Sequence, residues 1–341
     1  MLSSKLCGIN EEVEDSLENF FDKLSYILDR APFELKRELL RHLEYLANKN
    51  GCSVDKILAG KARILKNQIL TDAIANITSV LGVSPVQGDL ALYNSTFYES
   101  LIRRYIHLLQ PQLPANTLLV RIGNKNDGGY IFIDDFPKDT CIYSLGIGND
   151  TGFDLHMASM GFPINMYDHT INRLPYEHEL FYFSRVGIAS KDSAPDFISF
   201  ETMLSMAPAQ HDNLILKMDI EGGEYDILST ISQPLLSRFR QIVIELHNLT
   251  RLDNKDATRK KLIALQKLND AHQVVHVHAN NNGAYTIISG IPFPDVLEVT
   301  WVRKKDFAPF LPSSFSYPIQ GLDAPNIPYR ADYALPFWGM R

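Results

Sequence analysis

The sequence contains few cysteines. Its 341 residues include only three, Cys7, Cys52 and Cys141, which lie far apart and form no C-x-x-C pair. Because disulfide frameworks and zinc–thiolate sites need several cysteines at suitable spacings, neither is expected here. A reducing compartment is therefore the simpler environment, and the sequence predicts a cytoplasmic protein.

The sequence also lacks long apolar runs. No stretch approaches the roughly 18 apolar residues that typify a membrane span. The first ten residues, "MLSSKLCGIN", lead into the acidic "EEVEDSLENF" without the apolar core of a signal peptide. We expect neither a transmembrane segment nor a secretory leader.

Runs of a single charge are absent as well. The chain carries 33 lysines and arginines against 40 aspartates and glutamates, for a formal net charge of −7. A mildly acidic surface without a basic arm argues against nucleic acid as the main partner. The 45% hydrophobic content is that of a globular protein with a sizeable core.

Two kinds of pattern divide the chain near residue 110. Before it, apolar residues recur at helical spacing in residues 11–30, 33–51, 54–82 and 95–110. We therefore predict a helical N-terminal region over 1–110, which packs on the main domain. Alternatively, these helices form a docking surface, for a second copy of the chain or for partner proteins.

From about residue 116, short apolar runs alternate with helical stretches. The first two runs, 118–123 and 129–136, flank the turn-rich "NKNDG" and predict a hairpin. Eight further strands are expected, at 141–148, 164–169, 182–189, 214–221, 242–247, 274–279, 284–289 and 297–304. Their nearly continuous apolar character is typical of a parallel sheet covered on both faces. We predict a doubly wound, mostly parallel, seven-stranded Rossmann-like α/β domain over 111–341, with at least one of the last two strands antiparallel.

In such a sheet, ligands bind beyond the carboxyl ends of the strands. The first predicted strand of the sheet ends in "SLGIGND", where Gly146 and Gly148 let the backbone approach a ligand closely. The second ends at Asp168, whose carboxylate can accept both hydroxyls of a ribose. Thr151 occupies the place of the third glycine in a dinucleotide fingerprint. These residues favour S-adenosylmethionine, which has a ribose but no phosphate, over a dinucleotide.

Three later strands each end in two polar residues that lie two positions apart. Residues at this spacing share one face of a strand, where a burial rule predicts Val or Ile. The pairs are Asp219 with Glu221, Glu245 with His247, and His276 with His278. Helix capping and solvation are the alternative explanation for any single pair.

Together, the pairs predict an active site. The strands that end in Asp219 and Glu245 are expected to be neighbours, about 4.8 Å apart, so their carboxylates can share one Mg²⁺ or Mn²⁺. His247 completes this catalytic and metal-binding set, or acts as a general base oriented by Glu245. Glu221 and His278 are reserve candidates for the same site.

The motif "LKMDIEGGEYDIL" at 216–228 resembles the signature of the FkbM-type methyltransferases, class I enzymes that use S-adenosylmethionine. Further pieces that resemble a branch of this family, across roughly 118–305, are "RIGNKNDGGYIF", "YSLGIGNDTGFD", "MYDHT", "VGIAS", "VIELH" and "HVHANN". The resemblance implies O-methylation of a sugar hydroxyl, in a glycan or its precursor, with Gly146, Gly148, Asp168 and Asp219 at the cofactor.

Ser144 departs from the class I pattern, which carries an acidic residue just before the glycine loop. Asp127, with Gly128 beside it, is expected to take over that contact with the methionine end of the cofactor. Two other functions remain open from the sequence. One is a nicotinamide-dependent oxidoreductase on the same sheet, and the other is a non-catalytic binding module that works through the N-terminal helices.

Overall fold

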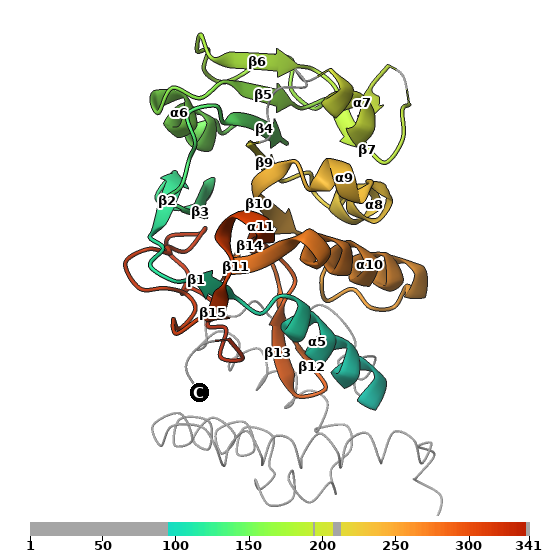
Figure 1. Ribbon diagram of the computed structural model, residues 1–341. Coiled ribbons are helices and arrows are strands. Elements are labelled where there is room, and N and C mark those ends of the chain that lie inside the picture. Colours follow the sequence, from blue (N-terminus) through green and yellow to red (C-terminus); the bar gives the residue numbers. More distant parts are fainter. Residues whose placement is uncertain (1–94, 194, 207–212, 339–341) are drawn as a thin grey trace, which may run out of the picture. The chain divides into compact units, whose positions relative to one another are not determined.

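A computed structural model describes residues 95–193, 195–206 and 213–338 of the chain (Figure 1). The helices predicted before residue 95 lie outside these residues. The chain divides into two compact units, residues 1–99 with 287–291, and residues 100–286 with 292–341. The site described below belongs to the second unit.

Seven strands form the main sheet. In spatial order they are β11 (His272–Ala279), β14 (Leu297–Arg303), β10 (Phe239–Leu246), β9 (Leu214–Met218), β4 (Cys141–Leu145), β5 (Ile164–Tyr167) and β6 (Phe181–Ser184). Strand β14 runs antiparallel to both β10 and β11, whereas the pairs from β10 to β6 are parallel. The predicted fold class is therefore confirmed: this is a Rossmann-like, seven-stranded sheet in the arrangement of class I methyltransferases.

The other strands pair outside this sheet. The predicted hairpin consists of β2 (Leu119–Gly123) and β3 (Gly129–Ile133). The remaining pairs are β1 (Gln112–Pro114) with β15 (Phe310–Pro312), β7 (Gly187–Ala189) with β8 (Phe197–Ser199), and β12 (Tyr285–Ile288) with β13 (Ile291–Pro294). The run at 284–289 is thus a strand but not one of the main sheet, and the run at 182–189 is divided between two strands.

Helices cover both faces of the sheet (Figure 1). On one side lie α8 (Glu224–Thr230), α9 (Gln233–Leu236) and α10 (Lys255–Ala271), and on the other lies α6 (Gly152–Ser159) with the hairpin. The remaining described helices are α5 (Thr96–Leu108), α7 (Phe200–Ser205) and α11 (Lys304–Phe307). In the part of the chain that the structure describes, no helix is both long and apolar enough to span a bilayer.

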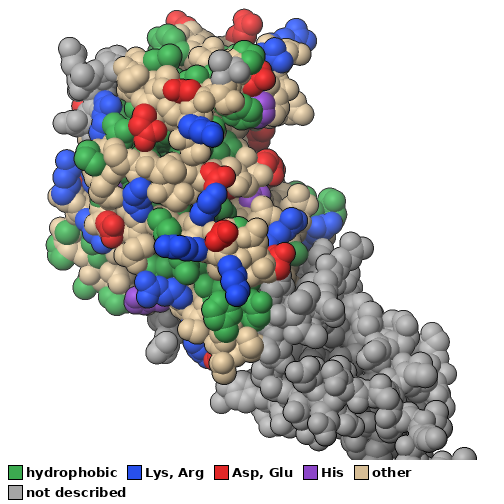
Figure 2. Space-filling model, turned by 90° about the vertical axis from the view of Figure 1, so that its right-hand side faces the viewer, with side chains coloured by type: hydrophobic (Ala, Val, Ile, Leu, Met, Phe, Trp, Pro, Cys, Tyr) green, Lys and Arg blue, Asp and Glu red, His purple; other side chains and the backbone are tan. Residues whose placement is uncertain are grey.

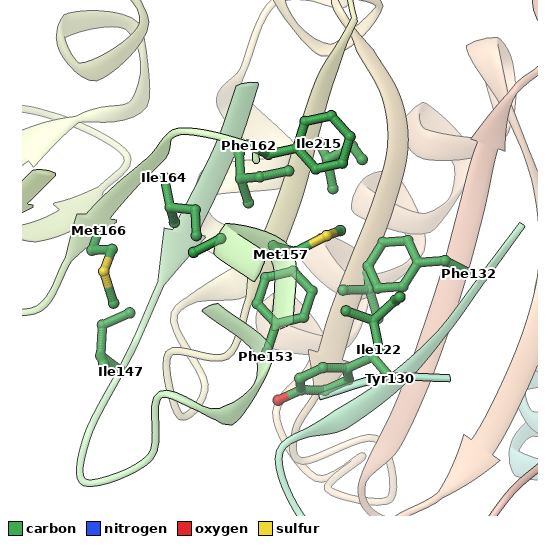
Figure 3. Packing of buried hydrophobic residues seen from close by; sticks show 13 residues of the cluster. Ile122, Tyr130, Phe132, Ile147, Phe153, Met157, Phe162, Ile164, Met166 and Ile215 are labelled. Atoms are coloured by element: carbon green, nitrogen blue, oxygen red, sulfur yellow. The ribbon is translucent and has the colours of Figure 1, made fainter. Parts of the chain in front are cut away.

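An apolar cluster joins α6 and the hairpin to the sheet (Figure 3). Its buried members include Tyr130 and Phe132 of β3, Phe153 and Met157 of α6, and Ile142, Ile164 and Ile215 of the sheet. Burial of each large apolar side chain contributes about 1.5–3 kcal/mol. This packing fixes α6 and the hairpin over one face of the sheet.

Buried polar contacts fix the register of the hairpin on that face. The Gln241 side chain accepts a hydrogen bond from the backbone of Ile133 at 3.0 Å and donates one back at 2.9 Å. The hydroxyl of Thr300 donates to the carbonyl of Ile131 at 2.5 Å. These bonds tie β3 to β10 and β14, so the hairpin loop stands beside the carboxyl ends of the parallel strands.

The surface carries both signs of charge, as the composition predicts. On the face drawn in Figure 2, lysine and arginine side chains are interspersed with aspartate and glutamate and do not gather into one basic patch. That face therefore has no concentrated field of one sign.

Candidate active site

A pocket of about 500 Å³ lies at the carboxyl ends of β4, β5 and β9. Four of the predicted site residues line it, namely Gly146, Gly148, Asp168 and Asp219. Strand order explains this meeting, because β4 lies between β5 and β9 and all three point the same way. The volume is within the range of small-molecule sites, roughly 300–1,000 Å³.

The two glycines of the loop after β4 serve different needs. Gly146 has φ +77°, and a Cβ on it would lie 1.7 Å from the carbonyl oxygen of Asp219. Only a residue without a side chain allows the loop to pass so close to the end of β9. Gly148 has φ +56°, and a Cβ there would meet open space. Its left-handed backbone conformation, and not crowding, is what favours glycine there.

Asp168 already accepts four hydrogen bonds from the protein. Its Oδ2 accepts from the backbone N–H groups of Ile147 and Gly148, each at 2.8 Å. Its Oδ1 accepts from the backbone N–H and the hydroxyl of Thr170, at 2.7 and 2.6 Å. Burial alone would raise the pKa of Asp168, but these bonds hold it below its usual range. This carboxylate therefore organises the glycine loop.

Asp127 and Gly128 lie on the hairpin loop, outside the lining of this pocket. Gly128 has φ +74°, and a Cβ on it would lie 2.3 Å from Oδ2 of Asp150. Asp127 is exposed and accepts a hydrogen bond from Asn326 at 3.0 Å. Close packing of the hairpin loop on the glycine loop accounts for Gly128.

Ser144 is fully buried, and a carboxylate that the sequence interpretation missed lies near it. Asp154 of α6 contacts Ser144, and burial raises the pKa of Asp154 to about 6 despite the nearby charge of Lys217. Lys217 is aligned with Ser144 on the neighbouring strand and donates to the carbonyl of Gly146. An acid therefore reaches this region from the helix after the glycine loop.

Asp219, Glu245 and His247 come together as predicted. Met218 of β9 pairs with Ile244 of β10, so Asp219 and Glu245 follow matched positions of adjacent strands. Nε2 of His247 lies 3.9 Å from Oδ1 of Asp219 and 3.5 Å from Oε1 of Glu245. One ligand atom from each of the three residues fits within 4.8 Å of the others. This spacing suits a shared cation.

Two more carboxylates reach the same imidazole. Glu221 lies 3.4 Å from Nε2 of His247, and its side chain is 85% exposed. Glu224, which the sequence interpretation missed, is fully buried and lies 3.1 Å from Nδ1 of His247. In the sequence, the only signal of Glu224 is that it is an acid at the start of a helix, and the helix dipole explains such an acid equally well. Because a carboxylate accepts hydrogen bonds, Nδ1 carries the proton.

The crowding of acids changes proton affinities. Burial alone would lower the pKa of His247, but the hydrogen bond to Glu224 and the charges of Glu224, Glu245 and Asp219 raise it to about 9. Burial, with the charges of Asp219 and Glu298, raises the pKa of Glu245 well above its usual range. Burial also raises the pKa of Asp219, against the opposing charges of Lys217 and His247. In the absence of a metal, His247 is an imidazolium at neutral pH.

The third predicted pair, His276 and His278, lies on β11, beyond the antiparallel β14. Nδ1 of His278 lies 3.0 Å from Glu298, and its Nε2 lies 3.0 Å from Asp332. His276 lies 3.1 Å from Asp323. The reserve role of His278 in the His247 cluster is therefore wrong, because β14 separates the two strands and supplies Glu298 as its partner.

Comparisons with known proteins add little to the geometry. No family model matches the sequence, and no curated protein matches it. A structure of WbdD with the kinase inhibitor LY294002 is similar over 48% of this chain and 35% of that chain, at 12% identity and a TM-score of 0.28.

Two methyltransferase structures also resemble the chain. The 16S rRNA (adenine(1408)-N(1))-methyltransferase from Catenulisporales acidiphilia matches 48% of this chain and 87% of that chain, at 15% identity and a TM-score of 0.27. Human N-acetylserotonin methyltransferase in complex with SAM matches 82% and 69%, at 11% identity and a TM-score of 0.25. Identities and scores at this level do not establish a family, and the fold assignment rests on the strand order.

Proposed function

We propose that the chain transfers a methyl group from S-adenosylmethionine to a hydroxyl oxygen of a sugar, in a glycan or its precursor, as the FkbM-type enzymes that it resembles do. The observation that carries this proposal is the meeting of the glycine-loop pocket with the Asp219–Glu245–His247 cluster. Asp219 belongs to both, so a cofactor in the pocket and an acceptor at the cluster would lie side by side.

The residues of the pocket fit S-adenosylmethionine. Its size suits a nucleoside, Gly148 leaves open space, and Asp168 offers a ribose acceptor at the end of β5. When bound, the cofactor supplies a methyl group that its sulfonium already activates. The chain must then hold the acceptor oxygen in line with that methyl group and remove its proton.

The cluster supports two ways of handling that proton. In the first, Asp219, Glu245 and His247 would hold a Mg²⁺ or Mn²⁺, which carboxylate ligands suit and which would supply Lewis-acid polarisation of the hydroxyl. In the second, His247 is a base, and Glu224 at Nδ1 orients its ring in place of the predicted Glu245, which lies 3.5 Å from Nε2. A base at Nε2 and a metal on Nε2 both require loss of the proton that the surrounding carboxylates stabilise, and the excess of acid around His247 favours a divalent cation as its replacement. Treatment with EDTA and re-addition of Mn²⁺ tests this, because full activity after thorough chelation would eliminate a removable metal.

One calorimetric experiment tests the function against its alternatives. The full chain is titrated with S-adenosylmethionine and, separately, with NAD. We expect binding of the first alone. Binding of NAD alone would support the oxidoreductase, and binding of neither would favour a non-catalytic module acting through the N-terminal region. Acceptor profiling by mass spectrometry, with a gain of one methyl group as the readout, then identifies the sugar.

A further inference from the structure

A buried lysine lies between the cofactor pocket and the proposed catalytic cluster. Lys217 is 7% exposed and belongs to β9, the central strand of the sheet. Its neighbours in the register are Ser144 of β4 and Val243 of β10, and Val243 belongs to the apolar cluster of Figure 3. Taking an ammonium group out of water is costly unless the group is paired, so an apolar residue would suit the fold better. The contacts of this ammonium group therefore bear on function.

The first contact fixes the glycine loop. Nζ of Lys217 donates a hydrogen bond to the carbonyl oxygen of Gly146. Asp168 holds the same loop by accepting from the N–H groups of Ile147 and Gly148. A cation on the carbonyl and an anion on the two N–H groups together set the path of the backbone beside the pocket. Because Lys217 is on β9 and Asp168 follows β5, the sheet itself holds the loop in place.

The second contact orients Asp219. Nζ of Lys217 lies 3.9 Å from Oδ2 of Asp219, and the hydroxyl of Tyr130 donates to the same oxygen at 3.4 Å. Oδ1 of Asp219 has no hydrogen-bond partner among the described residues and lies 3.9 Å from Nε2 of His247. The two carboxylate oxygens thus have separate surroundings. Oδ2 faces Lys217 and Tyr130, which leaves Oδ1 for the catalytic cluster.

We propose that Lys217 is a positioning residue, which ties the loop beside the cofactor to the carboxylate beside the acceptor. One ammonium group, bonded to Gly146 and paired with Asp219, holds these two groups at a fixed spacing. In-line transfer depends on that spacing, because a misplacement of about 1 Å can lower a rate on the order of 100-fold. Lys217 is not among the residues that line the pocket, so it acts through its two neighbours and does not touch the cofactor. The inference rests on the proposed function and adds a residue to the same site.

The test compares two ligands on the full chain. Lys217→Met keeps the apolar stem of the side chain but removes the ammonium group. Calorimetry measures the affinity for S-adenosylmethionine and for S-adenosylhomocysteine, which lacks the positive charge on sulfur. If Lys217 positions the loop, the affinity for S-adenosylhomocysteine is expected to fall roughly tenfold to a hundredfold, as for the loss of a hydrogen bond from a charged group. If Lys217 only balances the charge of Asp219, that affinity stays unchanged and only the affinity for the cationic S-adenosylmethionine changes.

Lys267→Met is the matched control. Lys267 also donates to a backbone carbonyl, that of Ser229 at 3.0 Å, and neither residue lines the pocket. Both affinities are therefore expected to stay unchanged in this variant. Lys217→Gln is a second variant in case Lys217→Met does not fold. Its side chain remains polar but ends one atom short of Nζ, and the same fall in affinity for S-adenosylhomocysteine is expected.

Turnover tests the link to Asp219. With the acceptor that profiling identifies, kcat is measured at saturating S-adenosylmethionine for Lys217→Met, Asp219→Asn and the double variant. If Lys217 acts on the chemical step through Asp219, its loss lowers kcat in the natural chain but lowers it little further in Asp219→Asn. Full additivity of the two effects would overturn this link.

The outcomes separate the inference from the proposed function. A folded Lys217→Met with unchanged affinity for S-adenosylhomocysteine would overturn the inference, while binding of S-adenosylmethionine by the natural chain would still support the function. If the natural chain binds neither ligand, the proposed function fails, and the inference fails with it. Circular dichroism of each variant confirms that lost binding does not reflect lost folding.

Discussion

Two histidine–carboxylate clusters stand at the carboxyl ends of strands in one sheet, and they differ in how their charges are paired. At β11, each histidine has specific partners: His278 contacts Glu298 and Asp332, and His276 contacts Asp323. At β10, one imidazole faces four carboxylates, two of which, Asp219 and Glu221, also line the pocket. In the first arrangement every acid contacts a histidine and none lines the pocket, whereas in the second four acids share one histidine and two of them face the pocket.

The closed cluster has a structural task. Asp323 and Asp332 belong to the segment after β15, which has no helix or strand between Ser313 and Trp338. Asn281 holds the same segment, because its side chain accepts from the backbone of Ile327 and donates to neighbouring carbonyls. Buried side-chain pairs thus replace the backbone ladder that would otherwise fix the segment. A histidine at a strand end is informative only once its partners are known.

The largest expected effect is on catalysis at the open cluster. Asp219→Asn and Glu245→Gln keep the shape of each side chain but remove the charge that a metal or an imidazolium needs. We expect kcat/KM for methyl transfer to fall roughly 10²–10⁴-fold, as for the loss of a proton-handling group. Asp256→Asn, at an exposed acid in the first turn of α10, is the control. Near-normal turnover in both variants would mean that these acids serve helix capping and solvation and not catalysis.

The next largest effect is on stability at the closed cluster. His278→Ala leaves the buried Glu298 and the partly buried Asp332 without their shared partner. Breaking a buried ion pair from one side costs about 3–5 kcal/mol. We therefore expect the free energy of unfolding, measured in urea, to fall by that amount. A loss below about 1 kcal/mol, the usual range for exposed pairs, would show that the cluster contributes little to the stability of the fold.

Both clusters should also respond to pH, and the open one offers a defined window. The folded-state pKa of His247 is about 9, above its unfolded value of about 6.5. The stability that its charge contributes is therefore complete below about pH 6.5 and is lost as the pH rises through about 9. The shift corresponds to an upper limit on the order of 3 kcal/mol.

Unfolding of the EDTA-treated natural chain and of His247→Gln at pH 6 and pH 10 measures this contribution. The difference between the two proteins is expected to shrink at the higher pH. An equal difference at both values would mean that folding does not raise the pKa of His247 above its unfolded value of about 6.5, so neutral imidazole would be available at pH 7 and the base mechanism would regain support.

The fold was predictable because it depends on local and repetitive signals. Apolar runs between helical stretches predicted the parallel sheet, and the short gap before 297–304 predicted an antiparallel strand, now seen as β14. The sequence could not show that the run at 284–289 pairs outside the main sheet, because a strand of a separate hairpin can be as apolar as a strand of the sheet. The break near Arg185 in the run at 182–189 was missed for a similar reason.

The site was predictable where it depends on strand ends. Asp219, Glu245 and His247 follow from strand order and period, since neighbouring parallel strands end together. Glu224 and Glu298 were not recognised, because a lone acid in a helix start or an apolar strand shows no periodicity. The separation of His278 from His247 follows from β14, which lies between β11 and β10. The pairing of His278 with Asp332 is a long-range contact that no local pattern contains.

The smallest expected effect concerns the cofactor loop. Asp168→Ala should weaken S-adenosylmethionine binding about tenfold to a hundredfold, since hydrogen bonds to a charged group contribute about 1.5–3 kcal/mol. The same substitution also frees the backbone N–H groups of Ile147 and Gly148, so part of the loss would reflect a disordered loop.

Thr170→Val separates the two causes. It removes only the hydroxyl that occupies Oδ1 and leaves both loop contacts intact. If a ribose hydroxyl takes that place, calorimetry on Thr170→Val will show unchanged or tighter binding. Weaker binding in this variant would mean that Thr170 itself contacts the cofactor, and unchanged affinity in a folded Asp168→Ala would refute the ribose assignment.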